Sequence, residues 1–317
     1  MMIIAGILSA LAAAYLAVCY GVYRFAFYSP DKYQNDDYHI PEVLTRGPWK
    51  ERIREMISAV AALEYEKVSI TSRDGLRLNG RYFHSRDGAP LDICFHGYRG
   101  TPNRDFSGGA MVVLREGHNL LMVEERAQCS SQGHTMTFGV KERFDALDWV
   151  SYAVDRFGAD VRIIMTGISM GASTVLMASG MDLPENVRGI VADCPFTQPM
   201  DIILSVASSM KIPQGFSRHF ARAAARIFGG FDICGASALE AVKSTKVPIL
   251  LIHGEADDFV PCDMSRRIYE ANPSMTDLNT FPGATHGVSF LADEARYEEL
   301  VRSFSSRVLG DGISPGP

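Results

Sequence analysis

The pentapeptide Gly167-Ile168-Ser169-Met170-Gly171 decides the fold. It lies between an apolar run, residues 161–166, that predicts a buried strand and a stretch of small residues, 172–180, that predicts a closely packed helix. The two glycines permit a sharp strand-to-helix turn, because a bulky side chain on either flank would clash with the neighbouring backbone. We therefore expect Ser169 to be a nucleophile on this turn. A tight glycine turn with an ordinary serine is the alternative interpretation of the pentapeptide alone.

Two downstream loops carry carboxylates and a histidine in the chain order that a catalytic triad on this turn requires. The apolar run 247–253 predicts a buried strand, and a loop rich in carboxylates follows it. A further short strand, 275–281, precedes His286, which nearby glycines on both sides place in a loop. Because the carboxyl ends of parallel strands meet at one edge of a sheet, these loops are expected to lie beside Ser169.

Four blocks of sequence together carry a family resemblance. They are Phe95-His96-Gly97-Tyr98-Arg99-Gly100, residues 125–128 with 130–133, the serine pentapeptide, and the loops around residues 254–261 and 285–287. Over about residues 65 to 308 the chain resembles α/β-hydrolase fold serine hydrolases, similar to the bacterial membrane-anchored BEM46-like and ABHD13/ABHD17-like esterases. The resemblance implies an α/β fold with a doubly wound, mostly parallel sheet, an N-terminal antiparallel hairpin and a short helical lid.

The catalytic roles follow from the motif chemistry together with this resemblance. Ser169 is the expected nucleophile, and His286 is the group that takes its proton and returns it to the leaving group. The resemblance places the acid three residues before Val260, which selects Asp257. Asp258 is adjacent to that position and stays open as an alternative.

Other polar residues near strand ends have alternative interpretations. Asp193, at the end of the strand after the nucleophile helix, is a second alternative acid. His96 is expected to brace a turn by hydrogen bonding, and His253 is expected to be structural. Cys94 lies inside a predicted strand and is interpreted as a buried apolar thiol.

Two backbone N–H groups are expected to bind the oxyanion of a tetrahedral intermediate. One belongs to Met170, directly after the nucleophile, and the other to Tyr98, in the His-Gly-Tyr turn. Gly97, Gly167 and Gly171 give these turns the backbone freedom that they need. The chemistry is complete without a metal or a cofactor, and none is expected.

The expected activity is cleavage of acyl esters through an acyl-enzyme intermediate, on a small-molecule or lipid substrate. Thioesterase action on acylated protein or lipid is the alternative. Peptidase action and non-catalytic binding by an anchored protein are less favoured, the latter because serine, acid, histidine and oxyanion turn are all intact. Acyl length, physiological substrate and oligomeric state do not follow from the sequence.

Composition agrees with one large α/β core. The chain has 317 residues and 47% hydrophobic content, which suits a single domain of this class. A net charge of −6 and a pI of about 5.8, with no basic stripe, argue against a nucleic-acid partner. The six cysteines show no metal-ligand spacing and indicate a reducing compartment.

The N-terminus predicts a membrane anchor. Residues 1–23 contain no charged side chain and are long enough to cross a hydrocarbon core. A cleaved signal peptide and a lipoprotein processing site at Leu16-Ala17-Val18-Cys19 are the alternatives. Arg24 and Lys32 follow the apolar run, so the positive-inside rule predicts a single-pass protein with a cytoplasmic catalytic domain.

These patterns divide the chain into an anchor (1–28), a connector (29–64), a catalytic domain (65–310) and a flexible tail (311–317). Removal of residues 1–28 is expected to leave the catalytic domain soluble and active. Residues 51–63 predict an amphipathic helix that lies either on the membrane surface or against the domain. Residues 195–231 interrupt the alternation of strands and helices, and they are interpreted either as a lid over the acyl site or as an ordinary excursion.

Overall fold

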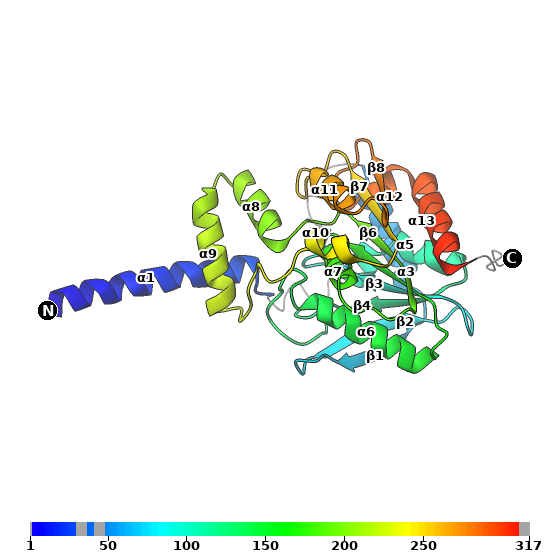
Figure 1. Cartoon of the computed structure of the whole chain (residues 1–317), viewed down its shortest axis with the longest axis horizontal. Coiled ribbons are helices and arrows are strands. Elements are labelled where there is room, and N and C mark those ends of the chain that lie inside the picture. The colour runs from blue at the N-terminus through cyan, green and yellow to red at the C-terminus, as the bar shows by residue number, and fades with distance from the viewer. Residues whose placement is uncertain (1, 30–36, 41–47, 311–317) are drawn as a thin grey trace.

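The structure is a computed structural model that describes residues 2–29, 37–40 and 48–310. The expected flexible tail at 311–317 and Lys32 of the orientation signal lie outside the described residues. Figure 1 shows a layered α/β body from which one long helix, α1 (Met2–Ala26), projects.

The body is built on one eight-stranded sheet with the order β1-β2-β4-β3-β5-β6-β7-β8. β2 pairs antiparallel with β1 and with β4, and the pairs from β4 to β8 are parallel. The predicted mostly parallel sheet with an antiparallel hairpin is thus confirmed. The strands are β1 (Glu66–Thr71), β2 (Arg77–Phe83), β3 (Leu91–Phe95), β4 (Asn119–Val123), β5 (Ile163–Ile168), β6 (Val187–Asp193), β7 (Ile249–Gly254) and β8 (Thr276–Phe281).

Helices cover both faces of the sheet. The central strands carry apolar side chains on both faces, and each face must therefore be buried. Ile163 of β5 faces the core beneath α6, α7 and α11, whereas the next residue, Ile164, faces the core beneath α3 and α13. The helices are α3 (Lys50–Ala61), α4 (Pro102–Asp105), α5 (Gly109–Arg115), α6 (Glu142–Phe157), α7 (Met170–Ser179), α8 (Pro199–Ser209), α9 (Gln214–Ile227), α10 (Ala238–Ala241), α11 (Asp263–Ala271), α12 (Ser289–Ala292) and α13 (Glu294–Leu309).

The strand β5 differs from its prediction by two residues. It spans Ile163–Ile168 instead of 161–166, because the N–H of Val161 donates to the carbonyl of Gly158 in a turn. The strand also ends two residues later than predicted, at Ile168, directly before Ser169.

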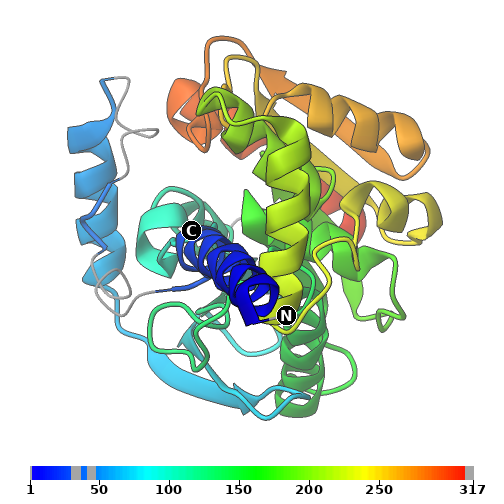
Figure 2. The same cartoon turned by 90° about the vertical axis from the view of Figure 1, so that its left-hand side faces the viewer.

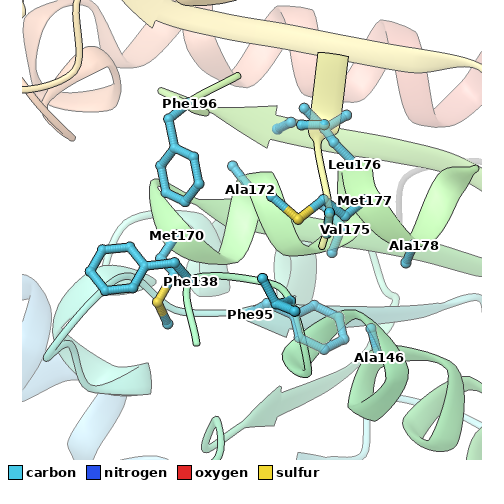
Figure 3. Close-up of a cluster of buried hydrophobic side chains, with 14 of the residues drawn as sticks. Phe95, Phe138, Ala146, Met170, Ala172, Val175, Leu176, Met177, Ala178 and Phe196 are labelled. Atoms are coloured by element: carbon cyan, nitrogen blue, oxygen red, sulfur yellow. The ribbon is translucent and has the colours of Figure 1, made fainter. Parts of the chain in front are cut away.

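The helix behind the serine, α7, is buried along its whole length. Small residues allow this close packing: a Cβ on Gly180 would lie only 2.8 Å from the Cα of Ala241. Figure 3 shows Phe138 and Phe196 beside Met170 at the N-terminal end of α7. The serine turn therefore rests on a rigid, fully packed helix.

The second half of α1 packs against the body. Figures 1 and 2 both show α9 beside α1, and Tyr15 Oη lies 3.1 Å from His219 Nε2 between them. Cys19 and Phe27 are fully buried, and the Phe27 ring contacts Phe138 and Phe231.

These contacts extend beyond the boundary that the sequence places at residue 28. The N–H of Met136 donates to the carbonyl of Phe27 at 2.8 Å, and that of Ser29 donates to the carbonyl of His134 at 2.9 Å. Tyr28 forms an isolated antiparallel bridge with Thr135. The chain up to Ser29 thus contributes to the packed body, a tertiary arrangement that apolar periodicity does not reveal.

The amphipathic segment at 51–63 forms α3, which packs on the body. Its apolar residues Ile53, Met56, Ile57 and Val60 are buried. On its polar face the Arg52 guanidinium donates two hydrogen bonds, of 3.1 and 3.0 Å, to the Glu294 carboxylate of α13. Burial leaves these apolar side chains unavailable to a lipid surface.

Candidate active site

Ser169 occupies the expected strand-turn-helix corner. Its backbone has φ 55° and ψ −110°, a strained conformation for a residue with a side chain. The flanking glycines are required by close approach: a Cβ on Gly171 would lie 1.9 Å from the carbonyl oxygen of Phe95, and one on Gly167 would lie 2.4 Å from Gly171. The N–H of Ser169 donates to the carbonyl of Asp193 at 2.8 Å, which fixes the corner to β6.

A chain of hydrogen bonds joins the three residues that the sequence selects. His286 Nε2 lies 2.9 Å from Ser169 Oγ, and His286 Nδ1 lies 2.7 Å from Asp257 Oδ2. Because a carboxylate only accepts hydrogen bonds, Nδ1 carries the proton and Nε2 accepts from the serine hydroxyl. In this arrangement the imidazole is ready to remove the serine proton.

In the loop after β7, both carboxylate oxygens of Asp257 have hydrogen-bond partners. Oδ1 accepts from the N–H groups of Phe259 and Val260 at 3.0 and 2.8 Å, and Oδ2 also lies 3.3 Å from His253 Nε2. Burial alone raises the pKa of Asp257, but hydrogen bonds from His253 and His286 outweigh it and hold the pKa below its ordinary value. The carboxylate is therefore ionised at neutral pH and stabilises a protonated His286.

The alternative acids have different surroundings. Asp258 is exposed. Asp193 is buried at the end of β6, where burial raises its pKa to about 6, and its Oδ1 accepts from Ser289 Oγ at 3.3 Å. His253, which the sequence analysis expects to be structural, is fully buried with Nδ1 2.7 Å from Ser265 Oγ. The geometry thus places Asp257, and not Asp193, on the imidazole of His286.

The His-Gly-Tyr turn lies directly beside the serine. A Cβ on Gly97 would lie 3.5 Å from the Cβ of Ser169. His96 Nδ1 lies 2.9 Å from the carbonyl oxygen of Gly97, and its Nε2 accepts from the N–H of Glu125 at 3.1 Å. Burial lowers the pKa of His96, so the ring stays neutral and braces the turn, as expected.

Asp105 holds the same turn from the other side and is a residue that sequence reasoning missed. Its Oδ2 accepts from the N–H of Gly97 at 2.8 Å, and its Oδ1 accepts from Arg104 Nε at 2.8 Å. The local signal was the Thr101-Pro102 start of α4, in which the Thr101 hydroxyl caps the helix. That signal predicts a helix start but not that its last residue reaches back to Gly97.

The turn is also tied to the end of α1. Tyr98 Oη donates to the carbonyl of Ala26 at 3.0 Å, and Arg99 Nη2 donates to the carbonyls of Phe25 and Tyr28 at 2.9 and 3.1 Å. Both residues belong to the turn that carries the candidate oxyanion amide. The N-terminal segment thereby positions a part of the candidate site.

A cavity of about 470 Å³ opens beside Ser169 and His286. Its lining combines apolar residues with a few polar groups, which is typical of small-molecule sites. No residue of the fully described segment 195–231 lines it. The segment therefore does not form a wall of this cavity: α9 packs beside α1, and α8 packs against α9.

Cys194 also comes close to the histidine and acid. Its Sγ lies within 4.8 Å of ligand atoms of Asp257 and His286, so the three could be considered as a metal site. Burial raises the pKa of the Cys194 thiol well above its ordinary value, which keeps it protonated. Both ring nitrogens of His286 are already engaged, with Ser169 and Asp257. This donor set therefore does not fit a metal ion, which needs a thiolate and an available ring nitrogen.

Two family models and several known proteins match large parts of this chain. The prolyl oligopeptidase family (Peptidase_S9) matches residues 135–312, and the X-Pro dipeptidyl-peptidase S15 family matches residues 24–215. The uncharacterized protein YqkD of Bacillus subtilis is 25% identical over 194 residues, which are 61% of this chain and 64% of YqkD. Protein bem46 of Schizosaccharomyces pombe is 21% identical over 247 residues, 76% of this chain and 77% of that protein.

A solved structure shows the same fold. The Pyrococcus furiosus esterase Pf2001 superimposes with a TM-score of 0.66 at 24% identity, covering 80% of this chain and 94% of that chain. Both family matches extend over more than half of the 317 residues. The chain therefore belongs to the α/β-hydrolase serine hydrolases of the prolyl oligopeptidase (S9) and X-Pro dipeptidyl-peptidase (S15) families, and it resembles bem46.

Proposed function

We propose that the protein is a carboxylic ester hydrolase with Ser169, His286 and Asp257 as its catalytic triad. The observation that supports this most directly is the continuous hydrogen-bond chain from Ser169 Oγ through His286 to Asp257 at the edge of the cavity. His286 Nε2 takes the serine proton while Oγ forms a bond to the ester carbonyl carbon. The alcohol then leaves with that proton, and water releases the acid by the same steps.

The oxyanion of each tetrahedral intermediate is bound by the N–H groups of Tyr98 and Met170. Met170 begins α7, so its amide is among the unpaired donors of a helix N-terminus, where the helix dipole favours negative charge. The neighbouring Gly97 amide is held by Asp105 and is occupied. Each oxyanion donor is worth about 3 kcal/mol of transition-state stabilisation.

Three substrates with one acyl group test the leaving-group preference. We expect purified protein to hydrolyse p-nitrophenyl octanoate faster than octanoyl-CoA, and octanoyl-CoA faster than octanoyl p-nitroanilide, by kcat/KM. The acyl group is constant, so differences report the oxygen, sulfur or nitrogen leaving group. A higher value for octanoyl-CoA would support the thioesterase alternative. A higher value for the anilide would contradict the ester hydrolase and support a peptidase.

We further propose that α1 is a single-pass membrane anchor, with the catalytic domain on the cytoplasmic side. The helix has 25 residues, and its most apolar 18-residue window has a mean hydropathy of 2.3 with 6% of that window buried. Its length, about 37 Å, exceeds a hydrocarbon core of about 30 Å. Burial of Cys19 and Phe27 in the body supports retention of the segment over its removal as a signal peptide.

Two N-terminal deletions separate the anchor from the contacts that α1 makes with the body. A chain lacking residues 1–14 keeps Tyr15, Phe27 and the carbonyls bound by Arg99, but its apolar segment is too short to span a bilayer. We expect carbonate extraction to release this shortened chain from membranes, whereas the full chain resists extraction. Its esterase kcat/KM is expected to stay within about twofold of the value for the full chain.

A chain lacking residues 1–28 loses the buried Phe27 ring, and truncation of such a ring costs about 3–5 kcal/mol of unfolding free energy. We expect it to be unstable in a thermal melt and poorly active. This revises the sequence-based expectation for that deletion. Carbonate-resistant protein after removal of residues 1–14 would contradict the anchor.

A further inference from the structure

The centre of the sheet is open on one face. Thr166 and Ile168 of β5 are partly exposed, although β5 is paired with β3 on one side and β6 on the other. The neighbouring Met165 packs into the core on the opposite face. A residue of an internal strand that faces a covering layer of helices is exposed only where that layer leaves a cavity.

The cavity beside Ser169 continues along this face. Its lining includes alternate residues of three adjacent strands, which share one face of the sheet: Asp92 and Cys94 of β3, Thr166 and Ile168 of β5, and Val191 and Asp193 of β6. Asp92 is in register with Ile164, five residues before Ser169. At about 3.3 Å per residue, the lining therefore extends about 16 Å from the serine.

Helices close the cavity from the other side. α3 contributes Ile53 and Met56, α5 contributes Val112 and Val113, and α13 contributes Val301. The amphipathic helix that follows the N-terminal segment thus forms a wall of the cavity, in the place where the sequence analysis put the lid. The Arg52–Glu294 pair holds α3 in this position against α13.

The acidic groups of the lining are already paired within the protein. Asp92 Oδ2 lies 2.7 Å from His118 Nδ1, and Asp193 Oδ1 accepts from Ser289 Oγ at 3.3 Å. These carboxylates therefore do not need a polar ligand as a hydrogen-bond partner. The remaining wall is mostly apolar, which favours a hydrocarbon occupant.

We propose that a single long, unbranched acyl chain binds extended along this face of the sheet, between β3, β5 and β6 and the helices α3 and α5. This rests on the proposed ester hydrolysis, with the carbonyl at Ser169. The length of about 16 Å matches one leaflet of a bilayer, about half of the 30 Å hydrocarbon core, which is the extent of one membrane-lipid acyl chain. Met56 and Val112 are then specificity-determining residues, because they line the cavity from α3 and α5, opposite the sheet.

The test uses p-nitrophenyl acetate, butyrate, octanoate and laurate with the full chain in detergent. In the wild-type protein kcat/KM is expected to rise from acetate to laurate, with up to about fourfold per added methylene from burial of apolar surface. Met56→Trp enlarges a side chain in the wall of the proposed acyl site and leaves less space for a long acyl chain. Its kcat/KM for laurate is expected to fall by about 50-fold, equivalent to about three methylenes, while butyrate stays within about twofold.

The neighbouring Glu55→Trp is the matched control on the same helix, because Glu55 is exposed. It is expected to leave both laurate and butyrate unchanged. Val112→Phe, with Met111→Phe as its control on α5, repeats the test from the second helix: Val112 lines the cavity and Met111 does not. This second pair decides the question if Met56→Trp does not fold.

The outcomes separate the two proposals. A wild-type protein that hydrolyses none of the four esters overturns the ester hydrolase itself. Hydrolysis of butyrate without any rise toward laurate overturns the acyl-chain site. Equal losses on butyrate and laurate in folded Met56→Trp or folded Val112→Phe also overturn it, because a merely structural role does not depend on chain length.

Discussion

Ser169→Ala is expected to abolish ester hydrolysis, lowering kcat by about a millionfold, while leaving the fold intact. The substitution removes the only atom that forms the acyl-enzyme bond in the proposed mechanism. The backbone N–H bond to Asp193 and the strained corner are properties of the main chain, so alanine retains them. The measurements are kcat on p-nitrophenyl octanoate, covalent labelling by a fluorophosphonate, and a thermal melt.

Ser179→Ala provides a control on the same helix. Ser179 is buried near the end of α7, and its hydroxyl donates to the carbonyl of Leu176, away from the cavity. This variant is expected to keep full labelling and activity. Fluorophosphonate labelling that persists in Ser169→Ala at the wild-type level would show that another residue is the nucleophile.

Local patterns predicted most of the fold correctly. The apolar run at 247–253 became β7 (Ile249–Gly254) and the short strand predicted at 275–281 became β8 (Thr276–Phe281), so both lie within two residues of the predicted bounds. The strand-turn-helix context of Ser169 was also predictable, because the glycines are needed for close backbone approach. These features depend on residues that are neighbours in the sequence, so periodicity and turn chemistry reveal them.

Features that depend on tertiary packing could not be predicted in the same way. A carboxylate such as Asp105, which holds the N–H of Gly97, carries no motif that specifies its partner. The binding of Arg99 to carbonyls at the end of α1 is likewise a contact between distant segments. The apolar pattern of residues 51–63 predicted an amphipathic helix, but not that part of its apolar face lines a cavity.

The helical segment 195–231 is a second case in which the sequence pattern did not identify the packing partner. Its apolar residues suggested a cover for the acyl site, whereas its second helix, α9, packs beside α1, which is itself apolar. Tyr15 and Tyr20 of α1 contact the rings of Phe220 and Phe228 of this segment. Amphipathic spacing therefore identifies a face that will be buried, and the choice of partner is decided by the three-dimensional arrangement.

Asp257→Asn is expected to lower kcat by about 10⁴-fold with little change in stability, on the precedent of other triads. Asparagine keeps a carbonyl oxygen that can accept from the N–H groups of Phe259 and Val260, as Oδ1 of Asp257 does. Its amide group then points toward His286 Nδ1 and donates to it. The imidazole proton then resides on Nε2, so this nitrogen can no longer accept the proton of Ser169.

Matched variants at the two alternative acids complete this prediction. Asp258→Asn alters an exposed side chain, and Asp193→Asn alters a buried group that bonds with Ser289 instead of His286. Both are expected to keep kcat within about tenfold of the wild-type value, since neither changes the tautomer of His286. Steady-state kinetics on p-nitrophenyl octanoate compare the three purified variants, with thermal melts to show that each is folded. If Asp193→Asn caused the 10⁴-fold loss while Asp257→Asn did not, the acid of the triad would belong to β6.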